Sequence, residues 1–381
     1  MIRNFKRTAA IFGVIAASST ALVACSGSNG SEGSSESAGA SGAASEAATE
    51  AKADESISGS LVGEGASSQQ NAMDVFSIAF TEAYPNATLS YTPSGSGAGV
   101  KAFINNTVTF AGSDSALKEK DGEPEAAKER CGGNDAWHLP SVIGPVAIAY
   151  NIEGVDKLNL SVDTVAKIFK GEIKKWNDPA IAAENEGTEL PDLDIAVVYR
   201  SDESGTSQNF QKFLTAATGN WDGEGKQFPQ EVGTGANGSS GVAGEVAAAN
   251  GAITYVEAGF AKDQGLGIAA LDFGNGPVEL NKDTVGVALE NLAFKDTGSE
   301  HNMVVDTEAL FASNDAGSYP LILTTYNIVC SAGYDEETSK LVKAFFNTVL
   351  ENQNDELEAR GFIPVTGAHL DRLKAAVEAI A

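Results

Sequence analysis

Basic residues are scarce in this chain of 381 residues, which has 25 Lys and Arg against 52 Asp and Glu and a formal net charge of −27. So acidic a chain argues against nucleic-acid binding, because DNA and RNA need a cationic surface to displace their counterions. At first sight it also argues against an anionic ligand. Exposed charges are screened beyond about 8 Å at physiological salt, however, so the net charge says little about a desolvated pocket.

Histidine is rarer still, and its scarcity restricts the chemistry that the chain can perform. His138, His301 and His369 are not at metal-ligand spacing, which argues against a histidine-based zinc site. We expect no metal and no cofactor. A serine hydrolase would need one of them beside its nucleophile, and the sequence has no G-x-S-x-G motif. The Gly-rich run at residues 95–99 fits neither the phosphate-cradling loop of NTPases nor the dinucleotide fingerprint.

Apolar runs long enough to cross a membrane are absent from the sequence. A short one at residues 9–17 follows a basic stretch and closes on Leu22-Val23-Ala24-Cys25, which resembles a bacterial lipobox. We interpret residues 1–24 as a lipoprotein signal peptide and Cys25 as the lipid-modified first residue; an ordinary secretory signal with an incidental Cys is the alternative. Residues 25–56 are rich in Ser, Gly and Glu, which predicts a flexible tether.

Only three cysteines are present, and lipidation of Cys25 leaves Cys131 and Cys330. An even remainder in an exported protein predicts one disulfide. Two buried free thiols are the alternative.

From residue 58 onward, short β-like runs alternate with amphipathic helices. Apolar residues at helical spacing predict a helix over residues 72–83, and others around residues 100–104 and 207–214. Apolar runs predict strands at residues 143–150, 195–199, 253–256 and 321–329. This alternation predicts an α/β fold with largely parallel sheets.

Three segments share one pattern, in which a strand leads through a Gly/Ser turn into a helix N-terminus. They run from Gly63 to Ser68, from Ser94 to Gly99 and from Arg200 to Ser207. A helix N-terminus offers unpaired N–H donors and partial positive charge, and Ser or Thr hydroxyls add further donors. Helix capping alone explains any single case, and Arg200 alone reads as a surface cation paired with Asp202. Together the three segments favour an oxyanion site.

The order of these motifs resembles that of the phosphate-binding proteins of Pst ABC transporters. The resemblance runs from about residue 58 to the C-terminus and is looser from about 265 to 320. It rests on Gly63-x-Gly-Ala, Gly95-Ser-Gly-Ala-Gly-Val-Lys, Asn106-Thr-Val-x-Phe-Ala-Gly-Ser-Asp114, Gly171-x-Ile-Lys-Lys-Trp-Asn-Asp-Pro179, Ala196-Val-Val-x-Arg200-x-Asp-x-Ser-Gly-Thr-Ser207 and Gly251-Ala-Ile-x-Tyr-Val-Glu257.

The resemblance implies a two-lobed, type II periplasmic-binding-protein fold with two mixed or parallel sheets joined by a two-strand hinge. Lobe 1 would comprise residues 57–146 and 327–381, and lobe 2 residues 147–326. It further implies a monomeric, non-enzymatic protein that binds inorganic phosphate with high affinity and delivers it to an ABC permease. Its location would be the outer face of the cytoplasmic membrane, anchored by the lipid on Cys25 as in Gram-positive lipoproteins.

The ligands implied by the resemblance come from both lobes, and they are Ser67, Ser68, Ser96, Asp114, Arg200, Ser204, Gly205 and Thr206, with Asp202 orienting the Arg. Ser67-Ser68 departs from the family, where many members have Thr-Phe. Asp114 by itself reads as a turn residue at a strand end. In a phosphate site it would accept a hydrogen bond from a protonated oxygen, which fully ionised sulfate cannot offer.

Alternative functions remain at this point. One is a binding protein for another tetrahedral oxyanion, such as sulfate or molybdate. Another is an exported phosphatase or hydrolase with Ser67 or Ser204 as nucleophile. A third is a surface adhesin or phosphate sensor without transport.

Overall fold

The computed structural model describes residues 54–381 apart from residues 291 and 314. The predicted signal peptide, Cys25 and the tether up to residue 53 lie outside the described residues. The strands are β1 (Ser58–Gly65), β2 (Asn86–Thr92), β3 (Phe110–Ser113), β4 (Ala136–Asn151), β5 (Asn159–Ser161), β6 (Ala196–Arg200), β7 (Thr234–Ala236), β8 (Ala252–Glu257), β9 (Gly267–Ile268), β10 (Ala270–Asp272), β11 (Pro277–Val278) and β12 (Ile322–Cys330).

The α-helices are α1 (Gln70–Ala83), α2 (Ser96–Ile104), α3 (Glu123–Arg130), α4 (Val162–Phe169), α5 (Pro179–Glu184), α6 (Gly205–Thr218), α7 (Gly238–Ala248), α8 (Ala258–Asp263), α9 (Lys282–Glu290), α10 (Thr307–Phe311), α11 (Glu336–Glu351), α12 (Asp355–Ala359) and α13 (Gly367–Ala379). The described residues also include two 3-10 helices, η1 (Ser67–Gln69) and η2 (Glu119–Asp121). Within the described ranges, no helix has the length and apolar character needed to cross a membrane.

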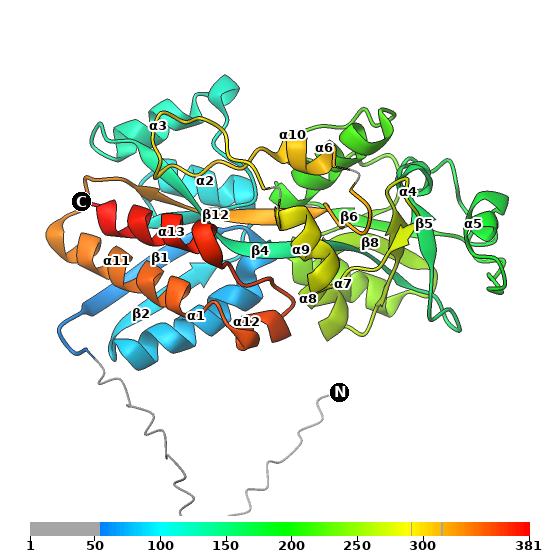
Figure 1. Ribbon diagram of the computed structural model, residues 1–381, viewed down its shortest axis with the longest axis horizontal. Coiled ribbons are helices and arrows are strands. Elements are labelled where there is room, and N and C mark those ends of the chain that lie inside the picture. The colour runs from blue at the N-terminus through cyan, green and yellow to red at the C-terminus, as the bar shows by residue number, and fades with distance from the viewer. Residues whose placement is uncertain (1–53, 291, 314) are drawn as a thin grey trace, which may run out of the picture. The chain divides into compact units, whose positions relative to one another are not determined.

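One strand, β4, connects the two halves of a large mixed sheet (Figure 1). The sheet order is β2-β1-β3-β12-β4-β8-β6-β7, with β9 also paired to β4. β4 pairs with β12 as far as Pro145 and with β8 from Val146 onward, antiparallel in both cases. β1, β2 and β3 are mutually parallel, as are β6, β7 and β8. The predicted α/β fold with mixed sheets is therefore confirmed, while the predicted lobe boundaries stay a prediction.

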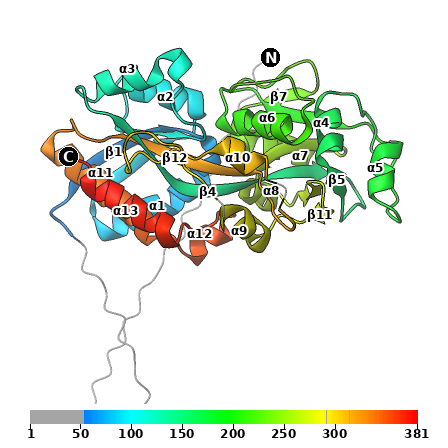
Figure 2. The ribbon, with the colours of Figure 1, turned by 45° about the horizontal axis from the view of Figure 1, so that its top comes forward.

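Helices cover both faces of the β1–β3–β12 half, with α1, α11 and α13 on one side and α2 and α3 on the other (Figure 2). The predicted helix over residues 72–83 is confirmed as α1. Its Phe80 ring lies 5.3 Å from that of Phe345 in α11, and the Phe110 ring of β3 lies 5.4 Å from that of Phe346. Such aromatic pairs each contribute about 0.5–1.5 kcal/mol beyond their buried area.

The β6–β8 half is covered by α6 and α7 on opposite faces. Alternate strand residues point to opposite faces: Val197 belongs to the same core cluster as Phe210 of α6, whereas Val198 packs in the cluster that contains Val242 of α7. The Tyr255 ring of β8 stacks 4.4 Å from that of Phe210. This packing fixes the N-terminal end of α6 relative to the end of β6, where the candidate site lies.

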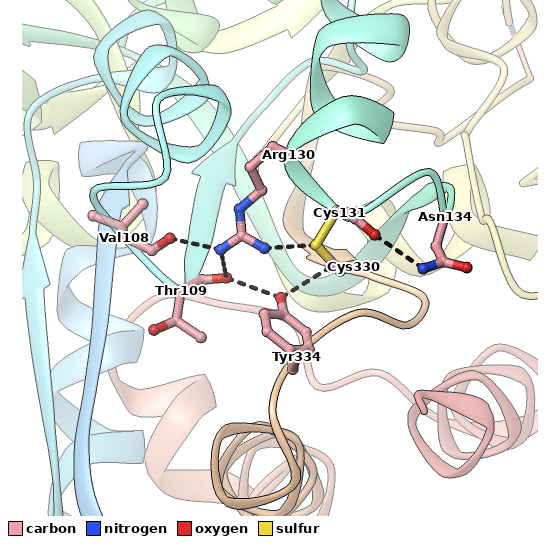
Figure 3. Close-up of a disulfide and its surroundings, with 7 residues drawn as sticks. All are labelled: Val108, Thr109, Arg130, Cys131, Asn134, Cys330 and Tyr334. Atoms are coloured by element: carbon pink, nitrogen blue, oxygen red, sulfur yellow. Dashed lines mark hydrogen bonds between the residues drawn. A yellow bond between two sulfur atoms is a disulfide. The ribbon is translucent and has the colours of Figure 1, made fainter.

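A disulfide joins Cys131, just after α3, to Cys330 at the end of β12, with 5.5 Å between their Cα atoms (Figure 3). The predicted bridge is confirmed, and the alternative of two free thiols is wrong. Both cysteines are fully buried. Arg130 donates from Nη1 to Cys330 Sγ (2.6 Å) and from Nη2 to the carbonyl of Val108 (3.0 Å), and its guanidinium lies over the Tyr334 ring.

Candidate functional site

A glycine brings the end of β1 against β3 and leads the chain into two buried serines. Gly65 has a φ of +141°, and a Cβ there would lie 2.0 Å from the carbonyl oxygen of Gly112; only glycine fits such a backbone. Ser67 and Ser68 follow in η1, and α1 begins at Gln70. The two serines therefore lie in a 3-10 turn ahead of the predicted helix.

Asp114 lies directly after β3 and is 3% exposed. Its Oδ1 accepts hydrogen bonds from the hydroxyls of Ser68 (2.6 Å) and Thr325 (2.8 Å), and its Oδ2 accepts one from Ser96 (3.2 Å). Burial raises the pKa of the Asp114 carboxyl, and these hydrogen bonds and the charge of Arg200 oppose the rise without cancelling it. A residue that reads alone as a turn is thus a buried acceptor surrounded by donors.

Arg200 ends β6 and is 2% exposed, so the alternative of a surface cation is wrong. Its Nε and Nη2 donate to the two carboxylate oxygens of Asp202, at 2.7 and 2.5 Å. Burial by itself would lower the pKa of the guanidinium, but Asp202, with smaller contributions from Glu257 and Tyr255, outweighs burial and raises it. Nη1 points elsewhere, donating to the Ser239 hydroxyl at 3.1 Å and lying 3.5 Å from that of Thr206. The bidentate pair holds the fork in one orientation.

The N-terminus of α6 meets Asp114 and Ser96. Ser204 is the N-cap, and its hydroxyl oxygen accepts from the N–H of Ser207 (3.1 Å). A Cβ on Gly205 would lie 2.4 Å from Ser96 Oγ and 2.6 Å from the Cβ of Asp114. Because only glycine permits so close an approach, the first-turn N–H groups of α6, which have no helical acceptor, lie beside the Asp114 carboxyl.

A second contact joins η1 to α7. The N–H of Ser239 donates to Ser67 Oγ at 3.0 Å, and the two hydroxyl oxygens are also 3.0 Å apart. Ser239 in turn accepts from Arg200. Ser67 is thereby connected to the guanidinium through one hydroxyl.

The eight ligand residues implied by the resemblance are all buried and lie in this one region, together with the half-buried Asp202. Their contacts connect two groups, one around the Asp114 carboxyl and one around the Arg200 guanidinium. The buried members are Ser67, Ser68, Ser96, Asp114, Arg200, Ser204, Gly205 and Thr206. Hydroxyl and N–H donors, one guanidinium and one buried carboxyl acceptor can hold a tetrahedral oxyanion that carries a proton.

Three residues of the site were missed by the sequence analysis: Ser239, Glu257 and Thr325. Ser239 is the second residue of α7 and follows Gly238, so the Gly/Ser signal used elsewhere would have found it. Glu257 ends β8 and accepts from the Thr206 hydroxyl at 2.7 Å. Thr325 lies in the middle of β12, where no local pattern distinguishes it from a core residue.

Comparison with known sequences identifies relatives over most of the chain. Residues 45–352 match the family model of the PBP superfamily domain. Phosphate-binding protein PstS 2 of Mycobacterium tuberculosis is 43% identical over 287 residues, covering 74% of this chain and 77% of the relative. PstS 3 of Mycobacterium leprae is 42% identical over 288 residues with the same coverage.

Comparison with solved structures gives the same fold at lower identity. The structure of PfluDING, a high-affinity periplasmic phosphate-binding protein bound with phosphate, matches 83% of this chain and 93% of its own, with a TM-score of 0.65 and 24% identity. A phosphate-binding protein from Stenotrophomonas maltophilia gives a TM-score of 0.64, also at 24% identity and with the same coverage. The chain belongs to the PstS family of phosphate-binding proteins, within the PBP superfamily.

Proposed function

We propose that this protein binds inorganic phosphate outside the cytoplasmic membrane and delivers it to an ABC permease. The site is the buried region around Asp114 and Arg200. The proposed ligands are the hydroxyls and N–H groups of the helix N-termini together with the Arg200 guanidinium and the Asp114 carboxyl: Ser67, Ser68, Ser96, Asp114, Arg200, Ser204, Gly205 and Thr206. Asp202 orients the guanidinium.

The buried Asp114 carboxyl carries this proposal. Two hydroxyls already occupy its Oδ1, whereas its Oδ2 accepts a single long hydrogen bond and keeps capacity for another. Near neutral pH, phosphate retains a proton that it can donate there, but sulfate is fully ionised. Facing Asp114, sulfate or molybdate could not donate to the remaining acceptor site on Oδ2 and would place a like charge against the buried carboxylate, which is costly. The geometry therefore favours phosphate over the other tetrahedral oxyanions.

Phosphate released from the purified protein tests the proposal directly. We expect denaturation to release close to one phosphate per chain, and the refolded, ligand-free protein to bind phosphate again in titration calorimetry. Sulfate at the same concentrations should give no heat of binding. Refolded protein that binds no phosphate, or that binds sulfate equally well, would contradict the proposal.

Arg200→Lys is expected to weaken phosphate binding by roughly 10- to 100-fold, because hydrogen bonds to charged groups contribute about 1.5–3 kcal/mol each. Lysine carries the same charge but cannot keep both the bidentate contact with Asp202 and a donor directed into the site. Titration calorimetry measures the loss. Arg360→Lys, at an exposed position, is the matched control and should leave affinity unchanged. Full affinity in R200K would argue against direct contact between Arg200 and phosphate.

The location outside the membrane rests on the N-terminal sequence. We propose that Cys25 carries the lipid, that residues 25–56 form the tether, and that the folded part consists of lobe 1 (57–146 and 327–381) and lobe 2 (147–326). β4 changes its pairing partner from β12 to β8 at Pro145/Val146, which supports the proposed lobe boundary between residues 146 and 147. Cys25→Ala should release the protein from membranes into the medium; continued membrane association would contradict the lipid anchor.

The chain belongs to a family of binding proteins, so the alternative of an exported hydrolase with Ser67 or Ser204 as nucleophile is wrong. The surroundings of His138 agree with this, because both of its ring nitrogens already have partners and neither lies against a proposed serine nucleophile. Its Nε2 accepts from the N–H of Leu117 (3.0 Å), and its Nδ1 lies 2.7 Å from the side-chain oxygen of Asn302.

A further inference from the structure

A second buried carboxyl, Glu257, lies beside the proposed phosphate site. It ends β8 and is 2% exposed. Its Oε1 accepts from the Thr206 hydroxyl at 2.7 Å, while its Oε2 is buried and has no hydrogen-bond partner among the residues that the structure describes. A buried carboxylate with an unpaired oxygen is costly, and this one lies next to a proposed ligand.

The charges around Glu257 do not compensate a second buried anion. The positive charge of Arg200, at the end of β6, stabilises the ionised form of Glu257, but the guanidinium is already paired with Asp202. The carboxyl of Asp114, after β3, destabilises that ionised form. Burial raises the pKa of Glu257, and Asp114 adds to the rise; the charge of Arg200, the hydrogen bond from Thr206 and the nearby Ser239 hydroxyl, which is not within bonding geometry of Oε2, oppose the rise without cancelling it. A bound oxyanion would bring one more negative charge to the same region and favour the protonated acid further.

The hydroxyl of Thr206 has only one proton to donate. When Glu257 is ionised, that proton points to Oε1, and Thr206 has no donor left for an oxyanion. When Glu257 carries a proton on Oε1, the acid donates to Thr206 Oγ1 and the threonine proton is free to turn toward the ligand. Arg200 Nη1, 3.5 Å from Thr206 Oγ1, is a donor to the threonine in either state, so it does not change whether the threonine proton is available to the ligand.

We propose that Glu257 takes up a proton from solvent when phosphate binds, and that this proton allows Thr206 to donate its own hydrogen bond to the ligand. Thr206 keeps its proton throughout and only redirects it, and no bond other than the O–H of Glu257 is formed in the protein. This inference rests on the proposed function, because it assigns a role to Thr206 as a phosphate ligand.

The proposal predicts a pH dependence with a definite sign. Phosphate affinity is highest at pH values where Glu257 is already protonated in the ligand-free protein. It falls as the pH rises through the pKa of Glu257 in the ligand-free protein. The decrease is at most on the order of tenfold per pH unit, the limit for uptake of one proton. The decrease in affinity ends once the pH exceeds the raised pKa of Glu257 in the phosphate complex, because Glu257 is then ionised with and without phosphate.

Glu257→Gln tests the proposal, because its amide N–H can donate permanently to Thr206. Phosphate affinity is measured by titration calorimetry from pH 5 to 9 for both proteins, and the ratio of their dissociation constants cancels the ionisation of phosphate itself. We expect the wild type to lose affinity relative to E257Q as the pH rises. Glu245→Gln, on the exposed surface of α7, controls for the change in net charge and should follow the wild type.

Thr206→Val provides an independent measurement if E257Q does not fold. Valine has no hydroxyl to redirect, so the wild-type loss of affinity with pH should disappear relative to T206V. Wild-type titrations in buffers of different ionisation enthalpy should also show proton uptake beyond that of T206V. Identical pH profiles and proton uptake in the wild type and the variant would overturn the role of Glu257 alone, whereas absence of phosphate binding at every pH would overturn the proposed function.

Discussion

Asp114→Asn is expected to remove most of the preference for phosphate over sulfate while weakening phosphate binding far less. A site built around one required hydrogen bond rejects an analogue that lacks it by roughly 10⁴–10⁵-fold. The carboxyl is buried among the hydroxyls of Ser68, Ser96 and Thr325, so sulfate cannot avoid it by recruiting water. Asparagine removes the negative charge and supplies an N–H that can donate to sulfate. Titration calorimetry with each anion gives the ratio of affinities.

The same titrations on Asp74→Asn are the control. Asp74 is exposed on α1, so this substitution makes the same change in charge away from the site and should leave both affinities as they are. If D114N discriminated between the two anions as strongly as the wild type does, Asp114 would not be the selective group.

Replacing both Cys131 and Cys330 with Ser is expected to cost about 5 kcal/mol in the free energy of unfolding. The bridge closes a loop with a sequence separation of 199 residues, and the chain-entropy relation gives about this value for a loop of ~200 residues. Natural domains are stable by only about 5–15 kcal/mol, so the loss is a large part of the total. Urea unfolding followed by tryptophan fluorescence measures it.

Reductant supplies the control for this second prediction. Unfolding the wild type in urea with dithiothreitol should lower its stability toward that of the double Ser variant, whose own curve should not respond to the reductant. A difference below about 1 kcal/mol between the oxidised wild type and the variant would show that the bridge contributes little. Phosphate is omitted from all samples, since ligand binding would add stability of its own.

Local patterns predicted the elements that bury one face against a neighbour. The 3.6-residue period of apolar residues is clear in α1, and its bounds follow the predicted helix within two residues. The first half of β4 was missed: the predicted strand began at residue 143, whereas β4 begins at Ala136. It is buried along almost its whole length and therefore shows no alternation. It also contains Pro140, which the sheet accommodates beside a register shift between Thr325 and Tyr326.

For the candidate site, the sequence predicted the residues that lie at chain turns and not those that reach it from elsewhere. The segments that contain Ser67, Ser96 and Ser204 were predicted because a Gly/Ser turn before a helix is a local pattern, and the resemblance named the individual serines. Thr325 contacts Asp114 from a position 211 residues away, and only the fold brings them together.

Helix capping, which the structure shows, and the proposed ligand binding are compatible roles for Ser204. As a cap, its oxygen accepts the N–H of Ser207, which leaves its hydroxyl proton available to an anion. The capping pattern therefore could not distinguish between the two roles.

The position of β12 has a consequence for how the protein folds. β12 (Ile322–Cys330) lies between β3 and β4, which precede it by some two hundred residues, and its Cys330 completes the disulfide. Until residue 322 has been synthesised, β3 and β4 cannot be joined, and each presents an open strand edge. Contacts so distant along the chain slow folding. The molecule therefore reaches its native state after synthesis of nearly the whole chain, with its last long strand closing the sheet.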